Sequence, residues 1–321
     1  MTDSATCSEA VPMPLPTPDP PSTDPLTGLS AFPLTPIRDG SLDTDAFAGL
    51  VDRLVTAGVD SIAPLGSTGC GPYLHTDERA EIARITVERA AGIPVIVGIG
   101  ALSTRDVLAN AASAEAAGAA ALLLAPVSYH PLTDDEVVAL FRTVASTSGL
   151  PLIVYDNPGT THFTFTTDLY ARLAEIETVA AIKIPGLPMS PEDWRARVAA
   201  IRTATSGRVA VGVSVDAYGA EGLIAGCDAW YSAIGGTLPG PMLAITRAAQ
   251  SGEAERAREL LVHLQPLWDL FAAHGGSLRV GAAIAEQLGL VNGHCLPAPL
   301  APLDAEGKET VAALIAALDL H

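Results

Sequence analysis

The chain has 321 residues, with 36 acidic and 18 basic side chains and a formal net charge of −18. This charge excludes a typical nucleic-acid-binding protein, because phosphate recognition depends on clustered Lys and Arg side chains. Hydrophobic residues make up 49% of the chain and charged residues 17%, which excludes global disorder and predicts a sizeable buried core.

Residues 1–28 are predicted to be a disordered or loosely draped tail. They are rich in Pro, Ser, Thr and Asp, and they contain no Lys or Arg. The segment lacks the basic region and the continuous apolar region of a secretory signal. No apolar run in the chain approaches the roughly 20 residues that span a bilayer, so we expect no membrane partner.

From residue 29 onward, short apolar runs recur about every 30 residues and predict eight buried strands. The runs are apolar throughout, which is typical of parallel strands that are covered on both faces. The predicted strands are Ser30–Leu34, Ser61–Leu65, Pro94–Gly98, Ala121–Ala125, Pro151–Tyr155, Val179–Ile184, Arg208–Val213 and Asp228–Ala233.

Helical patterns separate these runs, and several have recognisable first residues. The clearest predicted helices are Asp43–Ala57, a helix over 79–91 capped by Thr76 or Asp77, one from Ser103 to Ala117, and one over 134–144 that follows Thr133. The alternation predicts an α/β fold, a (β/α)8 TIM barrel over residues 29–250. An open doubly wound sheet is the alternative, but no GxGxxG or Walker sequence follows the first strand.

Residues 251–321 have a different pattern, with helices and no strand between them. The predicted C-terminal three-helix segment consists of Ala254–Phe271, Leu278–Leu288 and Ala305–Leu318. It is expected either to pack on the barrel or to bind a partner.

The four cysteines are widely spaced and form no CxxC pair. They are Cys7, Cys70, Cys227 and Cys295. This spacing disfavours a zinc ribbon or a disulfide framework and favours a reducing, cytoplasmic location.

Only two of the 18 basic residues are lysines, and one of them stands where chemistry is expected. Lys183 follows an apolar run at the carboxyl end of the sixth predicted strand, the end at which barrels of this kind carry their active sites. Burial lowers the pKa of a lysine, and a neutral amine can attack a ketone to form a Schiff base. A strand-end lysine that pairs with a carboxylate is the alternative. Lys308 lies in the last predicted helix and is expected to be solvated.

Two neighbouring strand ends offer groups that could assist Lys183. Tyr155 ends the fifth strand, and parallel neighbours lie about 4.8 Å apart, so its phenol can reach the lysine and move a proton. The turn Ser67-Thr68-Gly69 follows the second strand, and its hydroxyl and N–H groups suit a carboxylate. A core tyrosine and an ordinary glycine-containing turn are the structural alternatives.

Further candidate substrate-binding residues stand at other predicted strand ends. They are Gly212, Ser232, Tyr129, His130 and His162. We expect no cofactor and no metal site, because the seven histidines show no HxH or HxxxH pairing.

Four motifs occur in a fixed order: Phe32-Pro33-Leu34-Thr35-Pro36, Gly66-Ser67-Thr68-Gly69, Tyr155-Asp156-Asn157-Pro158 and Ile182-Lys183. With this spacing the chain resembles the dihydrodipicolinate synthase/N-acetylneuraminate lyase family of class I aldolases over roughly residues 29–304. The resemblance implies a (β/α)8 barrel with a C-terminal three-helix segment, usually as a tetramer. It also implies a Schiff base between Lys183 and pyruvate or another 2-oxo acid, with Tyr155 as proton shuttle and Ser67 and Thr68 holding the carboxylate.

The chain departs from the family's pattern at several positions. Cys70 replaces a glutamate, Asp156 replaces the asparagine of the YNxP motif, and Thr160 replaces an arginine that binds the semialdehyde carboxylate in synthases. The relay tyrosine aligns with Ser128, and Tyr129 is one residue away. The missing arginine argues against lysine biosynthesis and favours a neutral or aldehyde-bearing acceptor.

The sequence therefore predicts a lyase or aldolase that acts on pyruvate or another 2-oxo acid, with an aldehyde as its partner substrate, in a homotetramer or homodimer. A 2-oxo-3-deoxy sugar acid dehydratase would use the same lysine, as would a dihydrodipicolinate synthase-like condensing enzyme. A non-catalytic ligand-binding barrel is a further alternative.

Overall fold

The computed structural model describes residues 24–321, and most of the segment predicted as a tail lies outside these described residues. Eight parallel strands form the central sheet. They are β1 (Gly28–Ala31), β4 (Ser61–Ile62), β5 (Ile96–Gly98), β6 (Ala121–Leu124), β7 (Leu152–Tyr155), β8 (Val179–Ile184), β9 (Ala210–Val213) and β10 (Ala229–Ser232). A short antiparallel hairpin, β2 (Ile37–Arg38) and β3 (Ser41–Leu42), follows β1.

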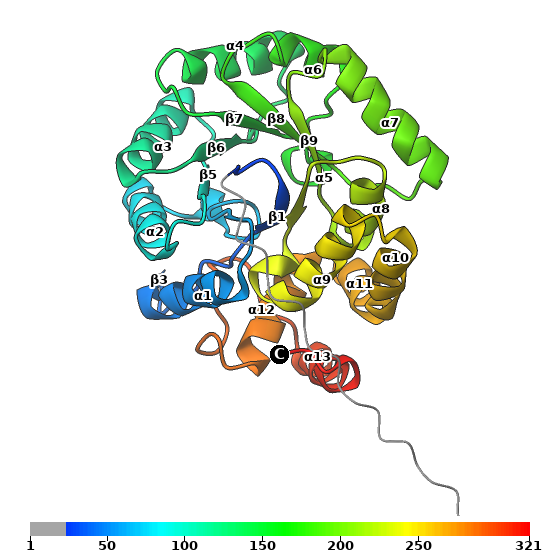
Figure 1. The fold of residues 1–321 in the computed structure, drawn as a ribbon. Coiled ribbons are helices and arrows are strands. Elements are labelled where there is room, and N and C mark those ends of the chain that lie inside the picture. The colour runs from blue at the N-terminus through cyan, green and yellow to red at the C-terminus, as the bar shows by residue number, and fades with distance from the viewer. Residues whose placement is uncertain (1–23) are drawn as a thin grey trace, which may run out of the picture.

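The sheet closes into a barrel. Its strand order is β4-β1-β10-β9-β8-β7-β6-β5, and a parallel bridge between Ile62 and Val95 joins the two ends. Figure 1 shows the helices as a ring around these strands. The ring and its connections contain α1 (Thr44–Ala57), α2 (Thr76–Arg89), α3 (Thr104–Ala117), α4 (Asp134–Ala145), α5 (Pro158–Thr161), α6 (Thr167–Leu173), α7 (Pro191–Ala204), α8 (Gly219–Ile224) and α9 (Pro239–Gln250). The predicted (β/α)8 barrel is confirmed.

Two strands differ from their predicted bounds because of proline. The first strand was expected over 30–34 and ends at Ala31, and the second was expected over 61–65 and ends at Ile62. Pro33 and Pro64 have no N–H to donate to a neighbouring strand. The chain therefore leaves the sheet before each proline, and the residues that follow form the mouth of the barrel.

Side-chain caps fix most of the predicted helix starts. The Ser103 hydroxyl accepts a hydrogen bond from the Asp106 N–H, and Thr133 caps α4 in the same way through Glu136. The helix after β4 begins at Thr76 with His75 as its cap, rather than being capped by Thr76 or Asp77. The His75 N–H donates to the Glu78 carboxylate at 2.8 Å, which explains the earlier start.

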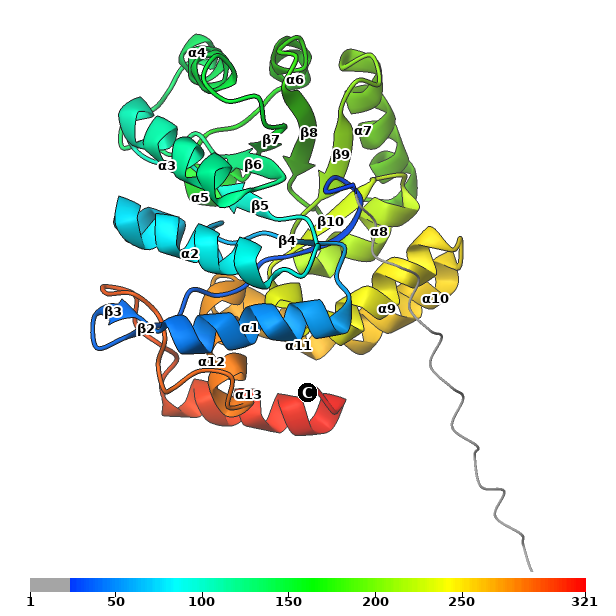
Figure 2. The same cartoon turned by 60° about the vertical axis from the view of Figure 1, so that its left-hand side comes forward.

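The C-terminal segment packs against the barrel near α1, as Figure 2 shows. It contains α10 (Ala254–His263), α11 (Gln265–Ala273), α12 (Ser277–Gln287) and α13 (Ala305–Leu318). The helix expected over 254–271 is thus divided at Leu264, because Pro266 cannot donate the N–H that would continue α10. No helix in residues 24–321 has the length and apolar character needed to cross a bilayer.

Three buried clusters hold these layers together. The largest lies between the strands and the surrounding helices. The second fills the barrel interior and includes Phe32, Tyr155 and Tyr231. The third joins the C-terminal segment to the barrel through Cys70, Ala285 and neighbouring apolar side chains. The residues after β4 therefore contact both the barrel mouth and the C-terminal segment.

Candidate active site

Lys183 lies in β8 with its side chain almost fully buried among aromatic rings. Its register partners are Tyr155 in β7 and Gly212 in β9. The Nζ atom lies 3.9 Å from the centre of the Tyr155 ring and 4.0 Å from that of Phe32. Residues 24–321 contain no ion pair to Lys183, so the alternative of a strand-end lysine paired with a carboxylate does not describe this site.

This environment disfavours the ammonium form. Burial lowers the pKa of Lys183 below its ordinary value of 10.5, and negative charge on Tyr155 or Asp216 opposes that shift only in part. A lysine held in this way can present a neutral amine at lower pH than an exposed lysine.

The Tyr155 hydroxyl lies at the centre of a small hydrogen-bond network. It is 2.8 Å from Ser67 Oγ and accepts a hydrogen bond from Asn157 Nδ2 at 3.0 Å. Burial by itself raises the pKa of Tyr155, but the charge of Lys183 and these hydrogen bonds outweigh it, so the pKa lies below its usual value. The phenol and the amine can therefore exchange one proton as a coupled pair.

The turn after β4 brings Ser67, Thr68 and Gly69 to the mouth. A Cβ atom on Gly69 would lie 2.8 Å from the Leu65 nitrogen, so the tight turn requires glycine there. Cys70 follows with a φ of 51°, and burial raises the pKa of its thiol to about 12. Cys70 is thus a buried apolar side chain at this turn and not a nucleophile.

Gly212 and Ser232 lie in neighbouring strands with partners inside the protein. A Cβ on Gly212 would lie 2.3 Å from the Tyr231 ring, so this glycine makes room for Tyr231. Ser232 Oγ donates to Asp216 Oδ1 at 2.7 Å and accepts from the Gly235 N–H at 2.9 Å. The substrate-binding roles of Gly212 and Ser232 stay predictions.

The remaining predicted contacts lie at the surface. Tyr129 has an exposed fraction of 88%, and its ring meets the His130 ring edge-on at 5.1 Å. His162, which ends α5 with a φ of 57°, is also exposed. The structure does not bring these three side chains into the group around Lys183, and their roles stay predictions.

The aspartate at the YNxP position faces a different environment from Tyr155. Asp156 Oδ2 accepts a hydrogen bond of 2.5 Å from the Tyr170 hydroxyl on α6. Burial raises the pKa of Asp156 to about 6, and the hydrogen bond from Tyr170 opposes this shift. The aspartate at this position thus bonds the loop after β7 to α6.

Sequence reasoning missed three groups that the fold places at the site. Phe32 supplies a ring face to Lys183, and Asn157 supplies a donor to Tyr155. Asp216 is fully buried after β9, where it accepts from Ser232 and from the Ile234 N–H, and burial raises its pKa. Its place just beyond a strand end was the signal that could have found it. Residues 24–321 hold no cluster of three or more His, Cys, Asp or Glu side chains that could bind a metal.

Comparison with known proteins places this site in a family. The model of the dihydrodipicolinate synthetase family matches residues 25–318. The chain belongs to this family. It is 33% identical over 298 residues to the 4-hydroxy-tetrahydrodipicolinate synthase of Aromatoleum aromaticum. This match covers 89% of this chain and 96% of the relative.

Solved structures of the dihydrodipicolinate synthetase family match the fold closely. Dihydrodipicolinate synthase from Agrobacterium tumefaciens is 43% identical with a TM-score of 0.87, and the match covers 92% of this chain and 99% of that one. The enzyme from Acinetobacter baumannii, solved with pyruvate, is 26% identical with a TM-score of 0.83 over 92% and 100% of the two chains. The predicted family is confirmed, and with it the predicted enzyme class, a Schiff-base-forming lyase.

Proposed function

We propose that this chain binds pyruvate or a closely related 2-oxo acid and forms or cleaves a carbon–carbon bond through an enamine on Lys183. The observation that carries this proposal is the buried Lys183 amine, which lies against the rings of Tyr155 and Phe32 without a carboxylate partner. A relative solved with pyruvate, described above, supports the choice of 2-oxo acid.

Each step in this proposal uses a group at the barrel mouth. The neutral amine of Lys183 attacks the keto carbon, and the Tyr155 phenol passes one proton from the nitrogen to the oxygen. The phenol then gives its own proton to the resulting hydroxyl group, which leaves as water and gives the protonated Schiff base. The Tyr155 phenolate then takes a proton from the neighbouring carbon, which gives the enamine. The enamine carbon attacks an aldehyde, the phenol gives its proton to the new alkoxide, and water releases the product and restores the lysine amine and the phenol; cleavage follows the reverse path. Ser67 and Thr68 are proposed to hold the carboxylate of the 2-oxo acid.

The acceptor is proposed to be an uncharged or aldehyde-bearing compound. Thr160 stands where synthases have an arginine, and its Oγ1 accepts a hydrogen bond from Asn157 Nδ2 at 2.9 Å. A hydroxyl at this position favours a sugar-acid substrate over a second carboxylate. For this reason a 2-oxo-3-deoxy sugar acid dehydratase, which would use the same Schiff base for elimination of water, is the second candidate.

We also propose that the active form is a homo-oligomer in a reducing cytoplasm. Three large apolar side chains on successive loops at the barrel mouth are at least half exposed: Tyr73, Leu102 and Tyr129. Exposed apolar side chains of this kind suit contact with a second copy of the chain. Cys70, Cys227 and Cys295 are free and buried, which suits a reducing compartment.

The experiment is reductive trapping, and the two lysines provide matched variants. The protein is incubated with pyruvate and sodium borohydride, and the adduct is mapped by mass spectrometry in wild type, Lys183→Arg and Lys308→Arg. We expect an adduct on Lys183 that Lys183→Arg abolishes and Lys308→Arg retains. Absence of an adduct with pyruvate and with a panel of other 2-oxo acids would overturn the proposal in favour of a non-catalytic binding barrel.

Product analysis separates the two enzymatic candidates once an adduct is found. The protein is incubated with 2-oxo-3-deoxy sugar acids, and the products are identified by mass spectrometry. Release of pyruvate supports the lyase, whereas a product that has lost one water and kept all its carbons supports the dehydratase.

A further inference from the structure

Arg79 carries a buried positive charge next to the turn that contains Ser67 and Thr68. It lies in the first turn of α2 and has an exposed fraction of 5%. None of the ion pairs in the described part of the chain involves Arg79. A buried guanidinium without a carboxylate is costly unless its N–H groups are satisfied in another way.

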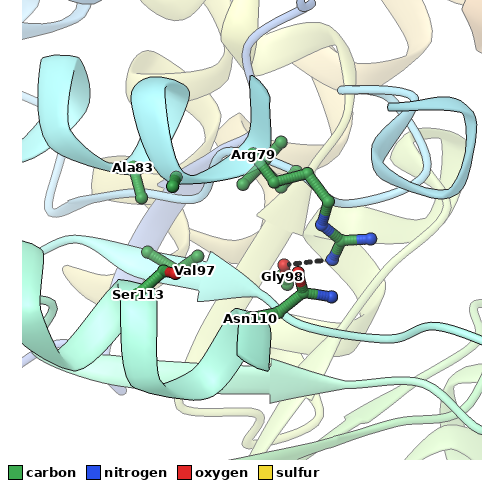
Figure 3. Close-up of a pocket in the computed structure, with 8 residues that line it drawn as sticks. Arg79, Ala83, Val97, Gly98, Asn110 and Ser113 are labelled. Carbon is green, nitrogen blue, oxygen red and sulfur yellow. Dashed lines mark hydrogen bonds between the residues drawn. The ribbon is translucent and has the colours of Figure 1, made fainter. Parts of the chain in front are cut away.

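Three backbone carbonyls accept hydrogen bonds from the two terminal nitrogens of the guanidinium, while its buried Nε has no partner within residues 24–321. Arg79 Nη1 donates to the oxygens of Gly71 at 3.2 Å and Gly100 at 3.0 Å, and Nη2 donates to Gly98 at 2.8 Å. Figure 3 shows the side chain reaching from α2 to Gly98 at the end of β5. Gly71 belongs to the turn after β4, so one side chain joins that turn to the neighbouring strand.

The turn that Arg79 holds is both crowded and strained. Leu65 and Cys70 adopt φ angles of 63° and 51°, a region that costs free energy for residues other than glycine. A Cβ on Gly71 or on Gly98 would lie 2.3 Å from the Leu65 oxygen, so the two backbones touch without side chains between them. A conformation of this kind persists only where its surroundings hold it.

We propose that Arg79 is a positioning residue for the reaction, which fixes the Gly66–Gly71 turn so that Ser67 meets Tyr155 and the turn can receive a carboxylate. Arg79 acts through the Gly71 carbonyl, and Ser67 Oγ lies 2.8 Å from the Tyr155 hydroxyl at the other side of the same turn. This inference rests on the proposed function, because it assigns the turn to the 2-oxo acid.

The test compares Arg79→Met and Arg79→Lys with Arg84→Met. Arg84 lies on the same helix, and its ion pairs with Glu81 and Glu88 are at the surface. In Arg79→Met we expect the KM for pyruvate to rise by roughly 10- to 100-fold, with a smaller change in kcat. Arg79→Lys, which can still donate to carbonyls, is expected to recover part of this loss, and Arg84→Met to match wild type.

Two further readouts distinguish positioning from a general loss of structure. The pH dependence of adduct formation is expected to stay unchanged in Arg79→Lys, because Arg79 does not contact Lys183. In the Arg79 variants without substrate, we expect hydrogen exchange at the Cys70 and Gly71 amides to be faster than in wild type. These amides donate to the carbonyls of Ser67 and Gly66 within the turn. If Arg79→Met fails to fold, the KM and hydrogen exchange are measured on Arg79→Lys instead.

The outcomes separate this inference from the proposed function. An unchanged KM in a folded Arg79 variant would overturn the inference while leaving the Schiff base intact. A wild-type protein that forms no adduct would overturn the proposed function. In that case exchange decides the positioning role: faster exchange at Cys70 and Gly71 supports it, and unchanged exchange overturns it.

Discussion

The two ends of the barrel differ in whether their buried or half-buried charged side chains form ion pairs. At the amino end, Asp60 accepts from Arg247 at 2.7 Å and from the Leu29 N–H at 2.7 Å. Asp228 is bonded in the same way to Arg202 and to the Val211 N–H. At the carboxyl end of the barrel, residues 24–321 provide no ion pair to Lys183 or to Asp216.

This difference explains why the amino end of the barrel stabilises the fold and the carboxyl end carries the reactive lysine. The Asp60 carboxylate, bonded to Arg247 and to the Leu29 N–H, joins α9 to the strands at the amino end. A buried amine without an ion pair is held closer to its neutral form, which is the form that attacks a carbonyl. The two lysines differ in the same way. Lys308 Nζ lies 2.7 Å from a Glu286 oxygen, whereas Lys183 forms no ion pair with any described residue.

The largest expected effect is at the reactive end, from Tyr155→Phe. Removing the phenol removes the proton carrier beside Lys183, and we expect kcat to fall by roughly 100- to 10,000-fold. Steady-state kinetics measure the loss, and Tyr170→Phe, which removes a phenol on α6, is the control that retains kcat. A Tyr155→Phe protein with wild-type kcat would mean that another group moves the proton.

A smaller effect is expected at the stabilising end, from Arg247→Met. The change leaves Asp60 buried without its charged partner, and we expect the free energy of unfolding to fall by roughly 1–3 kcal/mol. Urea unfolding measures this loss, with kcat unchanged. Arg256→Met removes an exposed ion pair to Glu259 and is expected to change stability by less than about 0.5 kcal/mol. Equal losses in the two variants would contradict the comparison.

Asp156→Asn tests a buried carboxyl group that has a hydrogen bond from Tyr170 but no ion pair among the described residues. Its pKa rises from 3.8 in the unfolded chain to about 6 in the fold, so the folded state binds the proton more tightly. The wild-type free energy of unfolding therefore falls as pH rises from about 4 to about 6 and stays lower above that range. We expect the variant to be more stable at pH 8 by roughly 1–3 kcal/mol, with no difference near pH 4.

Urea unfolding across this pH range checks the Asp156 prediction. Asp168→Asn, at an exposed position of α6, is the control and is expected to keep the wild-type pH dependence. A variant that is less stable than wild type at pH 8 would show that the charged Asp156 is better satisfied than its burial indicates.

The smallest expected effect is a shift in a pH profile, from Asp216→Asn. The negative charge of Asp216 raises the pKa of Lys183 against the dominant effect of burial, so removing it lowers that pKa further. We expect the acid limb of borohydride trapping to move to lower pH. Thermal unfolding confirms that the variant is folded. A limb that does not move would mean that Asp216 carries its proton in the native protein.

The sequence by itself predicted the barrel and the adjacent positions of Lys183 and Tyr155 at its mouth. Eight apolar runs at a regular spacing determine eight buried strands, and each strand end lies at the same mouth. Lys183 and Tyr155 end adjacent strands, so their contact follows from parallel pairing alone. The break at Leu264 was not predicted, although the proline two residues later was a signal for it.

Only the tertiary structure decided how these groups are surrounded. Three features each join residues from different elements or loops. They are the burial of Lys183 by Phe32, the bond of Asp216 to Ser232, and the three carbonyls around Arg79. Periodicity reports which face of an element is buried, but not which buried polar group meets which partner. The sequence therefore determined which residues reach the mouth, while the packing of the closed barrel determined their charges and their partners.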